Sequence, residues 1–163
     1  YILLTTHRPG NVDNEKSLRD LLEWMESIRK KSGKTILFPV HPRTQNNIQK
    51  FGLGSLITNF KVIEPIDFHD TIALENSAYM IATDSGGIQE EWCILQKKTL
   101  VLRENTERPE TVEVGWAILV GHDSVKMIAT YEILRDKAID WYNPFGDGKA
   151  WEKIIQIVST SSL

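Results

Sequence analysis

The sequence has little cysteine and no long run of apolar residues. Cys93 is the only cysteine among 163 residues, which excludes an internal disulfide and fits a reducing compartment. No apolar stretch approaches the roughly 20 residues that a helix needs to cross a bilayer. The opening residues, YILLTTH, show neither a basic segment nor a cleavage site. We therefore predict a cytoplasmic protein with no membrane partner.

An excess of charge of one sign is also lacking. Lys and Arg number 19 against 22 Asp and Glu, so the formal net charge is −3. This balance predicts no nucleic-acid partner. The histidines do not show the spacing of metal ligands and there is no cysteine pair, so no metal site is predicted. The length suits one ordinary domain, and an apolar fraction of 41% suits a soluble globular one.

Apolar runs alternate with helical patterns along the whole chain. Apolar residues between Leu18 and Ile28 recur at helical spacing, and Gly33 is placed to end that helix. Strands are predicted at 2–6, 35–41 (with Pro39 near its end), 61–65, 79–83, 99–102 and 116–120. Further helices are predicted at 70–78, after 86, at 109–115, at 123–138 and at 149–158. This alternation predicts an α/β fold, a doubly wound parallel sheet of the Rossmann type that is covered on both faces.

Polar residues gather where the predicted strands end. In a doubly wound sheet, ligands bind beyond the carboxyl ends of the strands. Charged, hydroxylic and glycine residues follow four of the six strands: His7 and Arg8, His41 and Arg43, residues 84–87, and residues 103–108. The sequence therefore predicts a binding site at this edge.

The stretch TDSGGIQEEW, residues 83–92, leads from a strand into a helix. Ser85, Gly86 and Gly87 would present backbone N–H groups and the positive end of the helix dipole to an anion, and glycine permits close approach. A carboxylate in the next turn, Glu90 or Glu91, can accept hydrogen bonds from a ribose diol. The alternative is an ordinary N-cap followed by acids that the dipole favours. GxGxxG and GxxxxGK[ST] are absent, which disfavours dinucleotide and P-loop sites.

The stretch LRENTERPETVEVG, residues 102–115, contains two arginines of interest. Arg108 precedes Pro109 at the start of a short helix, where a cation is unfavourable for the dipole, and this indicates an anionic partner. Arg103 is a second candidate phosphate ligand. We interpret Glu107 as a solvated loop charge.

Two histidines end neighbouring predicted strands. His7 and His41 are each followed by arginine within two residues, and either histidine could act as a general acid or as a partner of phosphate. A structural role is the alternative for both. Near the end of the chain, NPFGDGKA predicts a turn with Phe145 buried.

Five motifs in a fixed order carry a resemblance to a known family. They are THRPGN at 6–11, HPRT at 41–44, TDSGGIQEE at 83–91, LRENTERPE at 102–110 and NPFGDGKA at 143–150. Together they resemble the C-terminal half of the non-hydrolysing UDP-N-acetylglucosamine 2-epimerases, although Gly10 stands where that family usually carries glutamate. The resemblance implies a two-domain fold of the glycosyltransferase-B type. Residues 1–163 would be its Rossmann-like C-terminal domain, and the apolar start at Tyr1 fits a chain without its N-terminal domain.

The resemblance also implies an activity. Family members interconvert UDP-GlcNAc and UDP-ManNAc by eliminating UDP and adding it back, with no cofactor and no metal. The implied roles are diphosphate binding by Ser85, Gly86 and Gly87, ribose binding by Glu91, UDP binding by Arg108, an active-site position for His7, and a regulatory UDP-GlcNAc site at His41.

The implied partners are UDP, a UDP-N-acetylhexosamine and the missing N-terminal domain. Because the family's acidic catalytic residues belong to that domain, the chain alone is expected to be inactive. Family members are commonly dimers, so a homodimer is a further expectation, and the implied role is the supply of cell-envelope polysaccharide precursors. Two alternatives stay open: the nucleotide-sugar domain of a glycosyltransferase of the same fold, and a non-catalytic nucleotide-sugar sensor.

Overall fold

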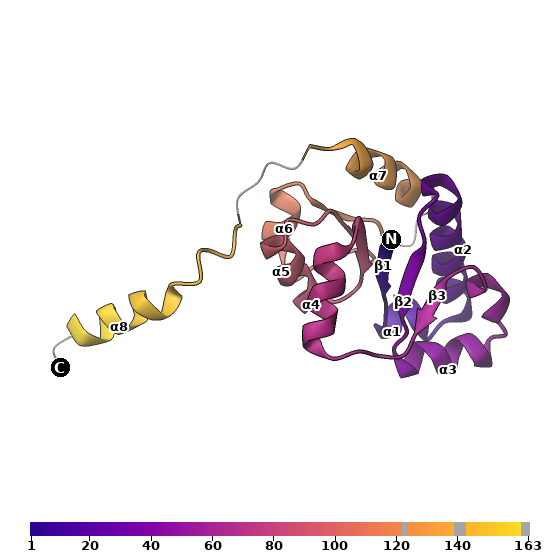
Figure 1. The fold of residues 1–163 in the computed structure, drawn as a ribbon, viewed down its shortest axis with the longest axis horizontal. Helices are drawn as coiled ribbons and strands as arrows, with labels where there is room; N and C mark the ends of the chain where they lie inside the picture. The colour runs from indigo at the N-terminus through magenta and orange to yellow at the C-terminus, as the bar shows by residue number, and fades with distance from the viewer. Residues whose placement is uncertain (122–123, 139–142, 161–163) are drawn as a thin grey trace.

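A single six-stranded parallel sheet forms the centre of the molecule. The computed structural model describes residues 1–121, 124–138 and 143–160. The strands are β1 (Ile2–Thr5), β2 (Ile36–Pro39), β3 (Lys61–Ile63), β4 (Met80–Thr83), β5 (Thr99–Val101) and β6 (Ala117–Leu119). Their order in the sheet is β3-β2-β1-β4-β5-β6, all parallel (Figure 1). This is the order of the doubly wound Rossmann fold, so the predicted fold class is confirmed.

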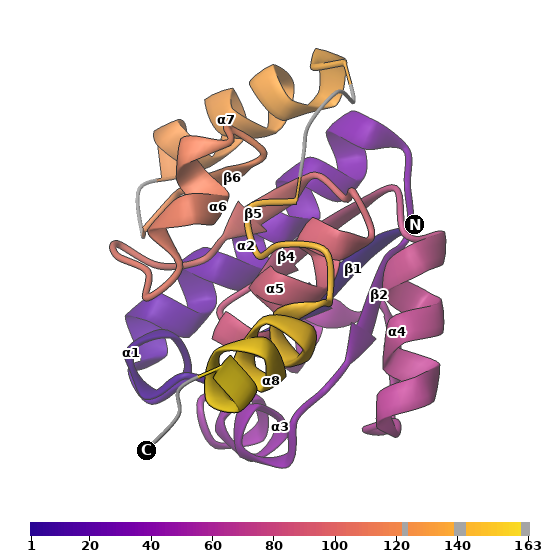
Figure 2. The same cartoon turned by 90° about the vertical axis from the view of Figure 1, so that its left-hand side faces the viewer.

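Helices cover both faces of the sheet. They are α1 (Pro9–Val12), α2 (Glu15–Ser32), α3 (Pro42–Lys50), the 3-10 helix η1 (Gly54–Ile57), α4 (Phe68–Ser77), α5 (Gly86–Ile94), α6 (Pro109–Glu113), α7 (Ser124–Asp136) and α8 (Ala150–Thr160). Buried residues of α2 and α7 pack on one face, and those of α4, α5 and α6 pack on the other (Figures 1 and 2). None of the described helices is long and apolar enough to span a bilayer.

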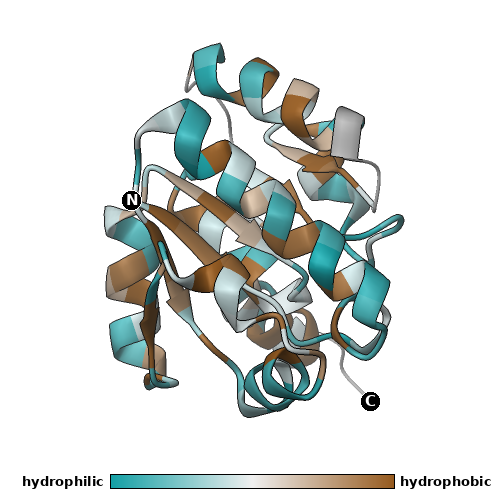
Figure 3. Ribbon diagram, turned by 90° about the vertical axis from the view of Figure 1, so that its right-hand side faces the viewer, coloured by the Kyte–Doolittle hydropathy of each residue, from teal (hydrophilic) through white to brown (hydrophobic). Residues whose placement is uncertain are grey.

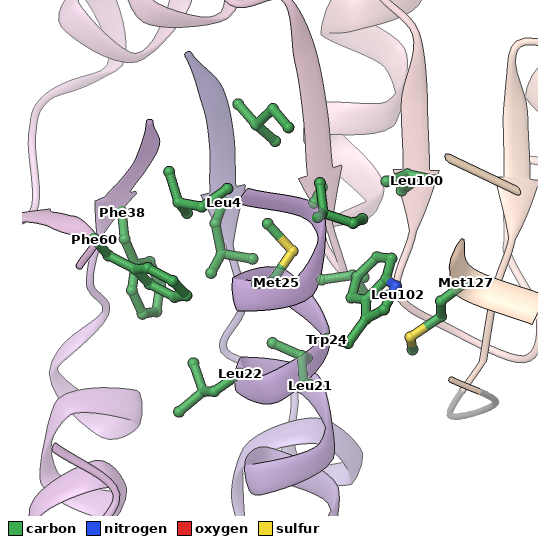
Figure 4. Packing of buried hydrophobic residues seen from close by; sticks show 14 of the residues in the cluster. Leu4, Leu21, Leu22, Trp24, Met25, Phe38, Phe60, Leu100, Leu102 and Met127 are labelled. Carbon is green, nitrogen blue, oxygen red and sulfur yellow. The ribbon is translucent and has the colours of Figure 1, made fainter. Parts of the chain in front are cut away.

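The alternation of side chains along each strand builds two cores. Ile2 and Leu4 of β1 enter the core on the α2 side, whereas Leu3 enters the core on the α5 side. Figure 4 shows Leu22 and Met25 of α2 directed at the sheet. In Figure 3 the strands are mostly hydrophobic, and hydrophilic residues gather on the helices around them. The sheet is therefore buried on both faces, as predicted.

The ends of α2 follow from local chemistry. The Asn14 side chain accepts a hydrogen bond from the Ser17 backbone N–H at 3.1 Å, which caps the start of the helix. Gly33 follows the last turn at φ 66°, a left-handed conformation that favours glycine, so the predicted end is confirmed. In β2, Pro39 is the last residue, as its position in the sequence suggests.

Helix α3 was not predicted. Only Thr44 and Ile48 of its nine residues are buried, so the stretch PRTQNNIQK lacks an apolar stripe. Pro42 at its first turn and His41 as N-cap are the signals that could have found it. The predicted start of the next-to-last helix at Asp123 lies outside the described residues.

Helix α8 stands apart from the sheet and the helices around it (Figure 1). All of its side chains are exposed, and five large apolar ones are 57–69% exposed: Trp151, Ile154, Ile155, Ile157 and Val158. Phe145, which was predicted to be buried, is 36% exposed. That prediction was wrong because the segment before α8 runs away from the sheet (Figure 1).

Candidate functional site

Asp84 is the centre of a buried hydrogen-bond network at the carboxyl ends of β1 and β4. Its side chain is 0% exposed, and its Oδ2 accepts hydrogen bonds from Thr6 Oγ1 at 2.7 Å, Arg8 N at 3.0 Å and Asn11 Nδ2 at 2.9 Å. The His7 backbone N–H also donates to this carboxylate, at 3.1 Å. The loop after β1 is therefore fixed to the loop after β4.

The same network reaches a third strand. Asn11 Nδ2 also donates to the Leu102 carbonyl at 2.8 Å, and Arg8 Nε donates to the Asp84 carbonyl at 3.0 Å. Sequence reasoning placed Asp84 at the rim but gave it no role. A carboxylate directly after a buried strand was the available signal.

A pocket of about 390 Å³ opens beside this network. Its lining comes from the loops after β1, β4 and β5: His7, Arg8, Ser85, Gly86, Gly87, Glu107 and Arg108. The structure thus brings five of the predicted site residues to one pocket, and they lie at the predicted edge of the sheet.

The first turn of α5 forms one wall of the pocket. Ser85 is the N-cap, and its Oγ accepts from the Ile88 N–H at 3.4 Å. Neither Gly86 nor Gly87 has a positive φ, so backbone strain does not explain them. A Cβ on Gly86 would lie 3.7 Å from the Glu107 carboxylate and 3.8 Å from the Arg8 guanidinium, so it would project into the pocket. Glycine keeps open the space in front of the N–H groups of a helix N-terminus, which favour an anion.

Glu107 lies between two arginines at the mouth of the pocket. Its carboxylate accepts from Arg103 Nη2 at 2.7 Å and lies 3.6 Å from Arg8 Nη1. The hydrogen bond from Arg103 lowers the pKa of Glu107 to about 2. Our interpretation of Glu107 as a solvated loop charge was incomplete, because this half-exposed carboxylate forms ion pairs with Arg103 and Arg8.

Arg108 has the anionic partner that its position at a helix start indicates. Its guanidinium forms an ion pair with Glu90 of α5. The Arg108 backbone N–H donates to Thr106 Oγ1 at 3.1 Å, and Thr106 in turn donates to the buried side chain of Gln89 at 2.6 Å. The loop before α6 is therefore fastened to α5, and Arg108 faces the pocket from it.

Two other predicted residues, Arg103 and Glu91, are not part of the pocket lining. Arg103 lines a neighbouring hollow of about 240 Å³ that also includes Gly10. Glu91 is half-buried on α5, within hydrogen-bonding reach of Glu75 on α4. Of the two carboxylates considered for a ribose, Glu90 is therefore the one paired with an arginine.

The two candidate histidines lie next to each other. His7 Nδ1 is 3.4 Å from Asp84 Oδ1, and the rings of His7 and His41 have centroids 5.5 Å apart with an interplanar angle of 32°. His41 Nδ1 accepts from the Arg43 N–H at 3.1 Å, which caps α3. His7 lines the pocket, whereas His41 lies next to the His7 ring and is not part of the lining.

The pocket suits a ligand with clustered negative charge. Three cationic or titratable side chains, His7, Arg8 and Arg108, surround the N-terminus of α5. Both arginines already have carboxylate partners, so an incoming anion must replace or share these pairs. Among the residues that the structure describes, no group of three or more His, Cys, Asp or Glu side chains could hold a metal ion.

Comparison with known proteins gives a consistent family. The family model described as UDP-N-acetylglucosamine 2-epimerase matches residues 1–159. A UDP-N-acetylglucosamine 2-epimerase of Methanocaldococcus jannaschii is 45% identical over 162 residues, which is 98% of this chain and 44% of that protein. The chain therefore spans less than half the length of this relative.

Solved structures agree with the sequence comparison. The Methanocaldococcus jannaschii UDP-GlcNAc 2-epimerase in complex with UDP-GlcNAc and UDP matches with a TM-score of 0.90, over 98% of this chain and 45% of that chain, at 45% identity. The Neisseria meningitidis UDP-GlcNAc 2-epimerase bound to UDP-GlcNAc matches with a TM-score of 0.81 over 98% of this chain and 44% of that chain, at 32% identity. An Escherichia coli heptosyltransferase with ADP matches with a TM-score of 0.54 at 14% identity, over 85% of this chain and 44% of that chain, which is a likeness of fold alone.

Proposed function

The chain belongs to the UDP-N-acetylglucosamine 2-epimerase family, and we propose that it is the UDP-binding half of an isomerase. That enzyme would interconvert UDP-GlcNAc and UDP-ManNAc by eliminating UDP and adding it back. The observation that supports this most is the pocket at the N-terminus of α5, where glycines and cations surround a place for a diphosphate.

The proposed residue roles combine lining residues of the pocket with Arg103 and Glu91, which lie outside its lining. The first-turn N–H groups behind Gly86 and Gly87, together with the Ser85 hydroxyl, would bind the diphosphate. Arg108 would pair with the same diphosphate, and Arg103 would support it after releasing Glu107. Glu91 would accept hydrogen bonds from the ribose hydroxyls.

The proposed reaction requires charge stabilisation more than new bonds to the protein. Removal of the C2 proton and cleavage of the bond between C1 and the UDP oxygen would leave a glycal and UDP, and the helix N-terminus and arginines would stabilise the diphosphate of that leaving group. His7 stands at the edge of the pocket, where it could transfer a proton or pair with phosphate. The acids and bases at C2 would come from the other half of the enzyme, so this chain alone would be inactive.

The proposed partners include that other half. The relative in Methanocaldococcus jannaschii is more than twice as long as the matched region, and the exposed apolar side chains of α8 offer a surface on which a preceding domain could pack.

We further propose residues 1–163 as one C-terminal domain, a homodimer as the assembly, His41 as part of a regulatory UDP-GlcNAc site, and a cytoplasmic role in supplying cell-envelope polysaccharide precursors.

The decisive experiment is an NMR titration of the chain with UDP, with UMP and ADP as comparators. We expect selective shifts in residues 84–91 and 103–110 with UDP. Arg108→Ala and Glu91→Ala should each weaken binding by about tenfold or more, because one charged hydrogen bond contributes about 1.5–3 kcal/mol. Arg19→Ala is the matched control, since Arg19 is an arginine paired with Glu15 on the surface of α2.

Two results would contradict the proposal. Equal chemical-shift changes with UDP and ADP would show that the chain does not distinguish uridine from adenosine. Equal losses of UDP affinity in Arg108→Ala and Arg19→Ala would show that UDP does not bind in the proposed pocket. Product analysis on the longer protein then decides the reaction: interconversion of the two UDP sugars without an acceptor supports an epimerase, and transfer of the sugar to an acceptor supports a glycosyltransferase.

A further inference from the structure

Glu75 is a buried acid without a hydrogen-bond donor. It lies in the last turns of α4 and is 0% exposed, and no described residue donates a hydrogen bond to either of its carboxyl oxygens. An ionised carboxylate in such a place loses its hydration and gains no hydrogen bond in return, which is unfavourable. The neutral carboxylic acid avoids that cost.

The acceptor for a proton on Glu75 is Glu91. Helix α4 packs against α5, and the Glu91 carboxyl lies within hydrogen-bonding reach of Glu75. Two ionised carboxylates have no donor between them, whereas an acid and a carboxylate form a short charge-assisted hydrogen bond. Burial, and then the charge of Glu91, raise the pKa of Glu75 to about 8.

The surroundings of the pair leave the proton on Glu75. Among the described residues, Glu91 is the charged group that acts on Glu75, and no cation offsets its effect. The neighbouring acid, Glu90, is engaged by Arg108 on the pocket side of α5. Glu91 is the half-buried member of the pair and Glu75 the fully buried one, so the charge stays where solvent or a ligand can reach it.

We propose that Glu75 is a positioning residue, which donates its carboxyl proton to a hydrogen bond with Glu91 and so orients that carboxylate toward the ribose of bound UDP. This inference rests on the proposed function, because it uses Glu91 as the ribose ligand. A neutral Glu75 fixes one oxygen of Glu91 and adds no second negative charge near an anionic nucleotide. Once Glu75 ionises, the hydrogen bond is lost and the two carboxylates repel.

The test compares UDP affinity from about pH 6.5 to about pH 9 in the wild-type chain and three variants. Glu75→Gln keeps a donor but cannot ionise, Glu75→Leu removes the donor, and Asp70→Asn removes an exposed acid from the same helix as a control. The ratio of wild-type to Glu75→Gln affinity cancels the ionisation of UDP itself. An infrared difference spectrum between the wild type and Glu75→Gln reports the carbonyl band of a protonated carboxyl group.

We expect that ratio to fall by about threefold to tenfold as the pH rises through about 8, a range typical of one hydrogen bond. At neutral pH, Glu75→Leu should lose affinity by a similar factor, while Glu75→Gln and Asp70→Asn stay near the wild type. The infrared band should be present at neutral pH and fade above about pH 8.

Each contrary result has its own meaning. A constant ratio, or a Glu75→Leu variant that binds UDP as the wild type does, would overturn the positioning role and leave the proposed function standing. Absence of the infrared band at neutral pH would overturn the proton on Glu75. A wild-type chain that does not distinguish UDP from ADP at any pH would overturn the proposed function, and the ribose role of the pair with it.

Discussion

Helices α2 and α8 are both amphipathic, and they lie in opposite surroundings. Six residues of α2 are buried against the sheet, among them Leu22 and Met25 (Figure 4). In α8 the corresponding apolar side chains are exposed, and Ile155 is 57% exposed. Within the described residues, the apolar side of α2 is buried, whereas the apolar side of α8 is exposed.

This difference shows what an amphipathic pattern can establish. The pattern says that a helix has an apolar side to bury, but it does not say which surface will bury it. For α2 that surface is the adjacent sheet. For α8 it is absent from the residues described, and folded monomers rarely leave such a continuous apolar surface exposed. The two helices therefore differ in their surroundings among the described residues, and the pattern of each helix alone does not show this.

The largest expected difference is in packing. Leu22→Ala should lower the free energy of unfolding by about 2–5 kcal/mol, because it leaves a cavity beneath α2. Ile155→Ala in α8 should change it by less than about 0.5 kcal/mol, as at other exposed positions. Urea unfolding of the chain measures both. Similar losses in the two variants would mean that α8 packs on the sheet domain in solution.

Two aspartates allow a similar comparison for polar contacts, because each accepts a hydrogen bond from a backbone N–H group. Asp84→Ala should cost about 2–4 kcal/mol, because it leaves several buried donors without an acceptor. Asp147, in the exposed turn before α8, accepts from the Lys149 N–H at 3.1 Å, and Asp147→Ala should cost less than about 1 kcal/mol. Thermal unfolding of both variants checks this, and equal melting temperatures would contradict a structural role for the Asp84 network.

The third prediction concerns the partner that would cover the apolar side of α8. In the longer protein that we propose, Ile155→Ser should lower the free energy of unfolding by about 1.5–3 kcal/mol, the cost of no longer burying an aliphatic side chain. In the 163-residue chain the same change should have almost no effect and should reduce self-association. If the longer protein tolerates Ile155→Ser equally well, α8 has no partner there.

A further difference is a pH dependence confined to the buried region. Because burial raises the pKa of Glu75 to about 8, the folded chain holds a proton that the unfolded chain releases near the ordinary pKa of glutamate. This contribution to stability is complete below the ordinary pKa of glutamate and is lost progressively as the pH rises from there to about 8. Glu75→Gln should flatten the decline, whereas Glu152→Gln in exposed α8 should not. Unfolding midpoints at a series of pH values test this, and parallel curves for the wild type and Glu75→Gln would contradict it.

The sequence predicted the sheet well because each strand is a short apolar run between turn residues. It also predicted the edge at which His7, Ser85 and Arg108 meet, since parallel strands bring their carboxyl ends together. Helix α3 was missed because a polar helix on a sheet margin needs only two buried residues.

Pairings between distant side chains could not be predicted. Glu75 is an ordinary surface acid in the linear pattern, and only the packing of α4 on α5 buries it. The exposure of Phe145 and α8 was likewise invisible, because the sequence shows an apolar residue but not the absence of its neighbour.

The Asp84 network connects parts of the pocket that are far apart in the sequence. Its hydrogen bonds to Thr6 and Asn11 join residues 78 and 73 positions apart in the chain. Contacts of such long range carry a loop-closure cost that is repaid only after β4 has paired with β1. During synthesis, the loop after β1 emerges from the ribosome well before residue 84, so the hydrogen bonds of His7 and Arg8 to Asp84 can form only after that residue has been added. We therefore expect the β1 side of the pocket to become ordered only when β4 pairs with β1.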